Sequence, residues 1–200
     1  MHGQGPAPTL TAVRRSRPGR IALEVDGRPW RVVPDDVVAS CGLRAGIELE
    51  RPLLRDLRRA LRRSEALEAA VRTVSRHDVS SRRLRQRLDA RGIPSSEAEA
   101  AVATLASAGV VDDERLARAR AQGIAARGWG DAAIATRLEQ EGLPFEAVTQ
   151  AIEELPTEHE RAVALVAREP DRHAAWRLLG RRGFAPETVE EVLGVLDDAR

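Results

Sequence analysis

The chain has 200 residues, 42% of them apolar, which is enough for one or two domains with a real hydrophobic core. Its single cysteine, Cys41, excludes an intramolecular disulfide framework and is typical of a protein from a reducing compartment. No apolar run reaches the length of a membrane span or of a signal-peptide core, so we expect a cytoplasmic protein without a membrane partner.

Charge is unevenly distributed along the chain, although the net charge is only +1. Residues 51–91 contain 13 arginines and 5 acidic residues, whereas residues 112–200 contain 12 arginines and 18 acidic residues. Such blocks are either partner-facing surfaces that steer association or the solvated helix faces of an arginine-rich protein. Charge alone leaves both interpretations open.

The first fifty residues predict a tail and a small module. Residues 1–8 carry two glycines and two prolines, which predicts a disordered tail. Residues 9–50 predict a β-containing module of a size that seldom stands alone. Apolar and more polar residues alternate over 21–25, and Asp26-Gly27 is a strong hairpin signal before a second apolar stretch. Two further elements are predicted here, a short helix over 35–40 and a strand over 47–49.

A long helix is predicted over 51–77, because apolar residues recur there at helical spacing while arginines fill the other side. The apolar positions are Leu54, Leu57, Leu61, Leu67, Val71 and Val74.

A pattern that occurs three times organises the rest of the chain. In each copy a leucine stands four residues before a glycine, and an apolar residue follows that glycine. Glycine adopts the positive φ that ends a helix, and the next apolar residue folds back onto the last turn. These positions therefore specify the fold and not the chemistry. They are Leu84, Leu88 and Gly92 in the first copy, Leu138 and Gly142 in the second, and Leu179 and Gly183 in the third.

The spacing of these copies predicts a mainly α protein of three tandem three-helix repeats, preceded by the small β-containing module. The long basic helix and the first repeat occupy 51–110, with helices at about 81–91 and 96–108. The second repeat occupies 111–155, and the third occupies 156–200, where Thr157-x-x-Glu160 has the spacing of a capping box. A single three-helix unit cannot bury its own apolar stripe, so neighbouring repeats should stack.

We find no sign of catalysis, of a cofactor site or of a metal site. The four histidines form no ligand spacing with each other or with Cys41, and the apolar surroundings of Cys41 favour a small buried thiol. No phosphate-binding or dinucleotide-binding glycine loop is present, and the chain contains no lysine. The sequence therefore predicts a protein that is not an enzyme.

Nucleic-acid binding has more support in the sequence than catalysis has. Residues 81–87 form a basic helix inside a three-helix unit, as in helix-turn-helix readers of DNA. This helix has one glutamine and no asparagine for adenine edges, and an aromatic content of 2% offers few platforms for base stacking. Any DNA contact should therefore be mainly to phosphates and should weaken with salt.

A series of motifs in the same order resembles the RecX family of recombination regulators. The resemblance covers about residues 60–198. It rests on Arg76-x-x-x-Ser80, Leu84-x-x-x-Leu88-x-x-x-Gly92-Ile93, Val111-Asp112-Asp113-Glu114-Arg115-Leu116-Ala117, Arg127-Gly128-Trp129-Gly130, Ile134-x-x-x-Leu138-x-x-x-Gly142 and Leu179-x-x-x-Gly183-Phe184. Two positions depart from the family pattern: Arg83 stands where Glu is common, and Leu116 stands where Phe is common.

The resemblance implies tandem three-helix repeats that bind the RecA recombinase filament on single-stranded DNA. It further implies that this protein blocks filament extension or promotes disassembly, and so lowers ATP hydrolysis, strand exchange and the coprotease activity behind the SOS response. We therefore expect a monomeric, non-enzymatic regulator without cofactors. The residues expected to contact the partner are Arg82, Arg85, Arg87, Arg91, Arg127 and Trp129.

Two alternatives stay open at this point. One is a DNA-binding module whose basic helices grip phosphates, with the recombinase playing no part. The other is a scaffold for an unrelated partner.

Overall fold

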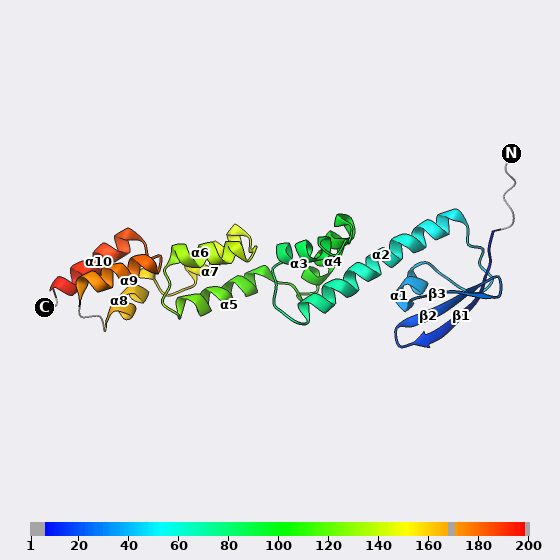
Figure 1. Cartoon of the computed structure of the whole chain (residues 1–200), viewed down its shortest axis with the longest axis horizontal. Coiled ribbons are helices and arrows are strands. Elements are labelled where there is room, and N and C mark those ends of the chain that lie inside the picture. Colours follow the sequence, from blue (N-terminus) through cyan, green and yellow to red (C-terminus); the bar gives the residue numbers. More distant parts are fainter. Residues whose placement is uncertain (1–6, 168–170, 199–200) are drawn as a thin grey trace, which may run out of the picture. The chain divides into compact units, whose positions relative to one another are not determined.

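A computed structural model describes residues 7–167 and 171–198 (Figure 1). Two compact units make up the chain: one joins the stretch up to Thr73 with Arg87–Thr104, and the other joins Val74–Gln86 with the stretch from Leu105 onward. The strands are β1 (Leu10–Arg17), β2 (Arg20–Val25) and β3 (Arg28–Pro34). The helices are α1 (Asp35–Ser40), α2 (Arg51–Val74), α3 (Ser81–Asp89), α4 (Ser95–Ser107), α5 (Asp113–Ala125), α6 (Asp131–Gln140), α7 (Phe145–Glu153), α8 (Glu158–Val166), α9 (Arg172–Arg181) and α10 (Pro186–Asp198).

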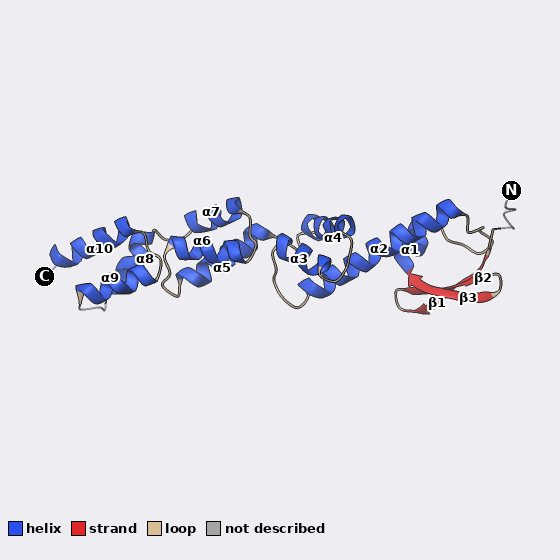
Figure 2. Ribbon diagram, turned by 45° about the horizontal axis from the view of Figure 1, so that its top comes forward, coloured by secondary structure: helices blue, strands red, loops and turns tan. Residues whose placement is uncertain are grey.

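The N-terminal module is a three-stranded antiparallel sheet in the order β1-β2-β3, followed by α1 (Figure 2, strands in red). The predicted hairpin turn is confirmed, because Asp26 and Gly27 have φ of +49° and +77°, as a two-residue hairpin loop requires. Strand β1 was not predicted. Its residues 14–17 are all exposed, so the strand has no regular alternation of buried and exposed side chains along its length. The predicted strand over 47–49 is wrong: only one bridge forms there, between Thr9 and Glu48.

The core of this module joins the sheet to α1 and to the first half of α2. Leu23 of β2, Val33 of β3, Val37 of α1 and Leu57 of α2 are all at most 1% exposed. The predicted buried thiol, Cys41, is only half-buried, and it packs at the margin of this cluster. The prediction of a disordered tail over 1–8 falls mainly on residues 1–6, which lie outside the described residues.

The long helix predicted over 51–77 is observed as α2, which ends at Val74. Its second half buries small residues, among them Ala66, Ala69, Ala70 and Thr73. Val71, expected on the apolar stripe, is instead 43% exposed. The stripe rotates because close-packed alanines, and not the larger side chains, form the buried face there.

All three predicted helix-ending glycines are confirmed. Their φ values are +78° at Gly92, +79° at Gly142 and +73° at Gly183. The residue after each glycine donates its backbone N–H to the carbonyl of the predicted leucine, at 3.2, 3.2 and 3.3 Å, which is the hydrogen bond of a Schellman cap. Leu84, Leu88, Leu138 and Leu179 are fully buried, as the repeat pattern predicts.

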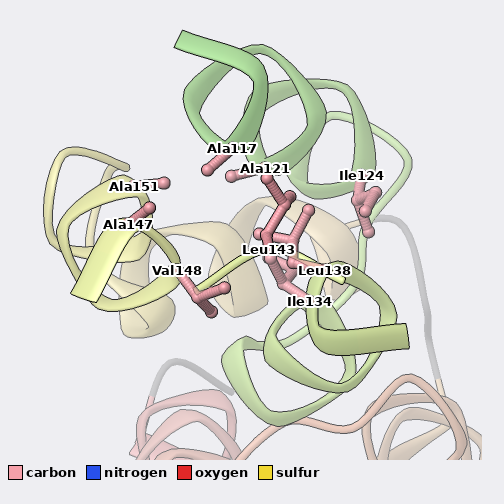
Figure 3. Close-up of a cluster of buried hydrophobic side chains, with 9 residues drawn as sticks. All are labelled: Ala117, Ala121, Ile124, Ile134, Leu138, Leu143, Ala147, Val148 and Ala151. Carbon is pink, nitrogen blue, oxygen red and sulfur yellow. The ribbon is translucent and has the colours of Figure 1, made fainter. Parts of the chain in front are cut away.

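The second repeat shows how one repeat builds its core (Figure 3). Ile134 and Leu138 of α6 are fully buried at its centre. Alanines face them from the neighbouring helices, and small side chains let helices approach closely. The alanines of this core are Ala117 and Ala121 of α5 and Ala147 and Ala151 of α7.

Consecutive repeats are joined by an acidic residue that caps a helix of the repeat before it. Asp113, the first residue of α5, accepts a hydrogen bond of 2.9 Å from the backbone N–H of Ser81, where α3 begins. Glu158, the first residue of α8, accepts one of 2.7 Å from the backbone N–H of Asp131, where α6 begins. The same type of contact therefore occurs at both junctions.

In the third repeat, the N-terminus of α9 is capped by a residue of the same repeat. The side chain of Asp171 accepts hydrogen bonds of 3.1 Å from the backbone N–H groups of His173 and Ala174. By contrast, the N-cap of α6 is Gly130, which has no side chain to offer. The cap of α9 therefore comes from the residue just before the helix, whereas the start of α6 is capped from the next repeat by Glu158.

None of the helices in the described part of the chain is long and apolar enough to cross a membrane.

Candidate functional site

An open groove of about 720 Å³ lies on the second repeat and the adjoining start of α3. We call it the arginine groove, because four guanidinium side chains line it. Its lining residues are Arg83, Ala119, Arg120, Gly123, Ile124, Arg127, Trp129, Arg137, Gln140 and Glu141. All of them belong to one compact unit.

Trp129 anchors one part of the arginine groove. The guanidinium carbon of Arg137 lies 3.4 Å from the centroid of its ring, and that of Arg182 lies 4.8 Å away. Arg182 also donates a hydrogen bond of 2.8 Å to the backbone carbonyl of Arg127. Cation–π contacts of this kind orient the guanidinium groups, so Trp129 positions arginines and does not itself present a free ring.

The charges of the arginine groove are only partly neutralised. Arg120 forms an ion pair with Glu141, in which Nε and Oε2 are 3.2 Å apart. For Arg83 and Arg127, the described residues supply no carboxylate partner. The groove therefore keeps a positive charge that an anionic ligand can neutralise.

The predicted partner-binding residues do not all converge. Arg127 and Trp129 line the arginine groove. Arg82 and Arg85 are exposed on α3 in the same compact unit but do not line that groove. The remaining two, Arg87 and Arg91, belong to the other unit.

Arg91 has a structural contact of its own. One guanidinium nitrogen donates hydrogen bonds to the carbonyl of Ala69, at 3.4 Å, and to the hydroxyl of Thr73, at 3.2 Å. Both acceptors lie in the last turns of α2, where a cation also interacts favourably with the helix dipole. Arg91 therefore ties its loop to α2.

Sequence reasoning missed three arginines of the groove: Arg83, Arg120 and Arg137. Arg83 was noted only as a departure from a family pattern. Arg120 and Arg137 stand in the acidic half of the chain, where the block charge hides them. Trp129 precedes α6 and Arg137 lies within it, so their separation of eight residues did not predict that the two side chains would be in contact.

A polar network that includes the backbone of Trp129 ties the second repeat to the third. Arg161 is 9% exposed at its side chain, donates a hydrogen bond of 2.7 Å to the carbonyl of Trp129 and pairs with the carboxylate of Asp131. Burial raises the pKa of the Asp131 carboxyl above its ordinary value, and the charge of Arg161 opposes that shift. Arg161 of α8 thus binds both the backbone before α6 and the first residue of α6, which makes the contact structural.

Metal ligation finds no support among the described residues, where no three His, Cys, Asp or Glu side chains gather. Among the acidic residues, Glu154 takes part in an ion pair. Glu154 lies at the C-terminus of α7 and pairs with Arg118 of α5, with Nε and Oε2 2.5 Å apart.

No family model matches the chain. A regulatory protein RecX from Stenotrophomonas maltophilia is 32% identical over 142 residues, an alignment that covers 66% of this chain and 87% of that protein. A regulatory protein RecX from Thermus thermophilus is 37% identical over 122 residues, with 60% of this chain and 84% of that protein covered.

Two solved structures share the fold. A crystal structure of a regulatory protein RecX superposes with a TM-score of 0.80 at 18% identity, covering 92% of this chain and 98% of the other. The crystal structure of RecX from Lactobacillus salivarius gives a TM-score of 0.61 at 15% identity, covering 68% of this chain and 97% of the other. The fold of tandem three-helix repeats is thus common to all three chains. The identity to curated relatives over most of their length shows that this chain belongs to the RecX family of regulatory proteins.

Proposed function

We propose that this protein binds the RecA recombinase filament on single-stranded DNA and lowers its activity, with the arginine groove as a contact surface. Membership of the RecX family supports this role, as does the regulatory name of the relatives. The observation that carries the choice of surface is the groove itself, where Arg83 and Arg127 converge without a carboxylate partner among the described residues. A regulator that acts by occupying a surface needs no catalytic group.

The charge distribution favours a target that includes protein as well as nucleic acid. Residues 112–200 carry 12 arginines and 18 acidic residues, and this net negative charge disfavours a bare phosphate backbone over the segment as a whole. Basic protein surface next to the DNA tolerates these acids. A filament offers both kinds of surface, so binding should be tighter to recombinase-coated DNA than to naked DNA.

Single-strand-dependent ATP hydrolysis by purified RecA, measured with and without this protein, tests the proposal. We expect hydrolysis to fall as the protein is added, at concentrations well below those that saturate naked DNA. Parallel titrations of naked and recombinase-coated strands at near-physiological salt separate the two functions. Tighter binding to the naked strand, with a steep loss of affinity as salt rises, would instead support a phosphate-gripping DNA-binding protein.

A further inference from the structure

Helix α9 presents an exposed face that the proposed function does not use. Positions i, i+3, i+4, i+7 and i+8 lie on one side of a helix, and five exposed residues of α9 have this spacing. We call it the α9 face, formed by His173, Trp176, Arg177, Gly180 and Arg181.

Trp176 is the centre of interest, because 61% of its surface is exposed. A large aromatic ring held in water is unfavourable for an isolated chain, and tryptophan is enriched at binding surfaces relative to the rest of a protein surface. The other two tryptophans have guanidinium groups over their rings, Arg31 at 5.4 Å from Trp30 and Arg137 at 3.4 Å from Trp129. Within the described residues no arginine lies over Trp176, so its ring is open to a ligand.

Gly180 stands one turn along the helix from Trp176. A Cβ atom at this position would meet no atom within 4 Å, so packing inside the protein gives no reason for a glycine. Glycine inside a helix is less stable than alanine by roughly 1 kcal/mol. Its effect here is to leave the helix surface beside the ring flat and open, which suits a planar group lying along α9.

Two arginines stand beside the ring on the same side of the helix. These are Arg177 and Arg181, which stand beside Trp176 and Gly180 on the α9 face. The carboxylate nearest in sequence, Asp171, is engaged by the backbone N–H groups that it caps. The α9 face therefore offers an open aromatic ring, a flat strip and neighbouring cations.

We propose that the α9 face binds single-stranded nucleic acid, with one unpaired base stacked on Trp176 and the adjoining phosphates contacted by Arg177 and Arg181. A nucleotide combines a flat π face with an anion, which is the combination that this surface complements. In a duplex the faces of the bases are covered by their neighbours, so the contact should prefer single strands. Stacking on an aromatic ring tolerates any base, so we expect little sequence preference.

Fluorescence anisotropy of a labelled oligothymidylate, titrated with the full chain at low salt, tests this proposal without any recombinase. Trp176→Ala should weaken binding about five- to hundredfold, the range that corresponds to the loss of one stacked base. Trp176→Phe keeps a ring and should retain most of the affinity. Trp30→Ala, at another exposed tryptophan, is the matched control and should bind like the unmodified protein.

Two further probes decide the kind of ligand. An abasic oligonucleotide of the same length keeps the phosphates, and its binding should not depend on Trp176. Polyglutamate tests the alternative of an acidic protein segment. Equal affinity of Trp176→Ala and the unmodified protein for oligothymidylate would overturn the proposal, as would a dependence on Trp176 that appears only with polyglutamate. Because the probe is naked DNA, failure of this proposal leaves the recombinase ATPase result unaffected, and the reverse also holds.

Discussion

Glu158 and Asp131 connect two repeats through a hydrogen bond of 2.7 Å from the backbone N–H of Asp131 to the Glu158 carboxylate. The second carboxylate oxygen of Glu158 accepts from the backbone N–H of Ala185, at 3.1 Å, and from the hydroxyl of Thr188, at 2.9 Å. One side chain therefore caps helices in two repeats. Asp113 makes the equivalent contact to Ser81 at the preceding junction.

Loss of this shared cap should destabilise the second and third repeats together. Glu158→Ala leaves three donors without their acceptor, and a lost helix cap alone costs about 0.5–2 kcal/mol. We expect the free energy of unfolding to fall by roughly 1–3 kcal/mol, measured by urea denaturation. Glu190→Ala, at an exposed position of α10, is the control and should change it by less than about 0.5 kcal/mol. Equal stabilities of the two variants would show that the cap contributes nothing.

Gly130 tolerates no side chain at the junction between the second and third repeats. A Cβ atom there would lie 2.3 Å from the carbonyl oxygen of Gly183 and 2.5 Å from the Cα of Phe184, both of which are backbone atoms. Gly130→Ala must therefore push the two repeats apart, and we expect a loss of at least about 2 kcal/mol. Gly180→Ala, where a Cβ atom meets nothing within 4 Å, should instead raise stability by up to about 1 kcal/mol. Thermal melting of the two variants checks the opposite signs.

Charge reversal distinguishes the arginine groove from the basic side of α3. We expect the double change Arg83→Glu and Arg127→Glu to abolish inhibition of the recombinase ATPase, because it reverses two charges of the groove that have no carboxylate partner among the described residues. Changing Arg82, Arg85 and Arg87 to Glu tests the surface that the sequence alone suggests. Arg44→Glu, an exposed position on the N-terminal module, is the control. Full inhibition by the groove variant would exclude the groove as the contact, whereas loss of inhibition only in the α3 variant would move the contact to that helix.

The capping box of α8 makes stability depend on pH. Hydrogen bonds from the hydroxyl and the backbone N–H of Thr157 lower the pKa of Glu160 below its ordinary value of 4.5. A carboxyl whose pKa is lower in the folded state stabilises the fold above its unfolded pKa, and this contribution is lost as pH falls through the folded pKa. The stability difference between the unmodified protein and Glu160→Gln should therefore be largest near pH 7 and should shrink below about pH 4. A difference that is constant with pH in urea titrations would contradict this linkage.

Local patterns proved reliable wherever a backbone requirement left a mark on neighbouring residues. The capping box at Thr157 and Glu160 is present, and the helix stops at Gly92, Gly142 and Gly183 lie where the pattern places them. Each depends on residues within one or two helical turns. The strand over 47–49 was wrong because the pairing there is too short for a strand: its backbone hydrogen bonds to the partner segment reach only Pro8 and Leu10, on either side of the single bridge between Thr9 and Glu48.

Residue order alone was sufficient to predict the succession of helices, the repeat architecture and the resemblance to the RecX family, because glycine caps and helical periodicity act over short spans. Which side chains meet depended on the folded arrangement. Arg83, Arg127 and Arg137 line one groove although they come from α3, from the turn after α5 and from α6, and no spacing along the chain encodes that convergence. The exposure of each tryptophan also depends on the tertiary structure. Arginines from two repeats cover Trp129, whereas Trp176 is 61% exposed. The reason is that a helix buries only the side that neighbouring elements contact.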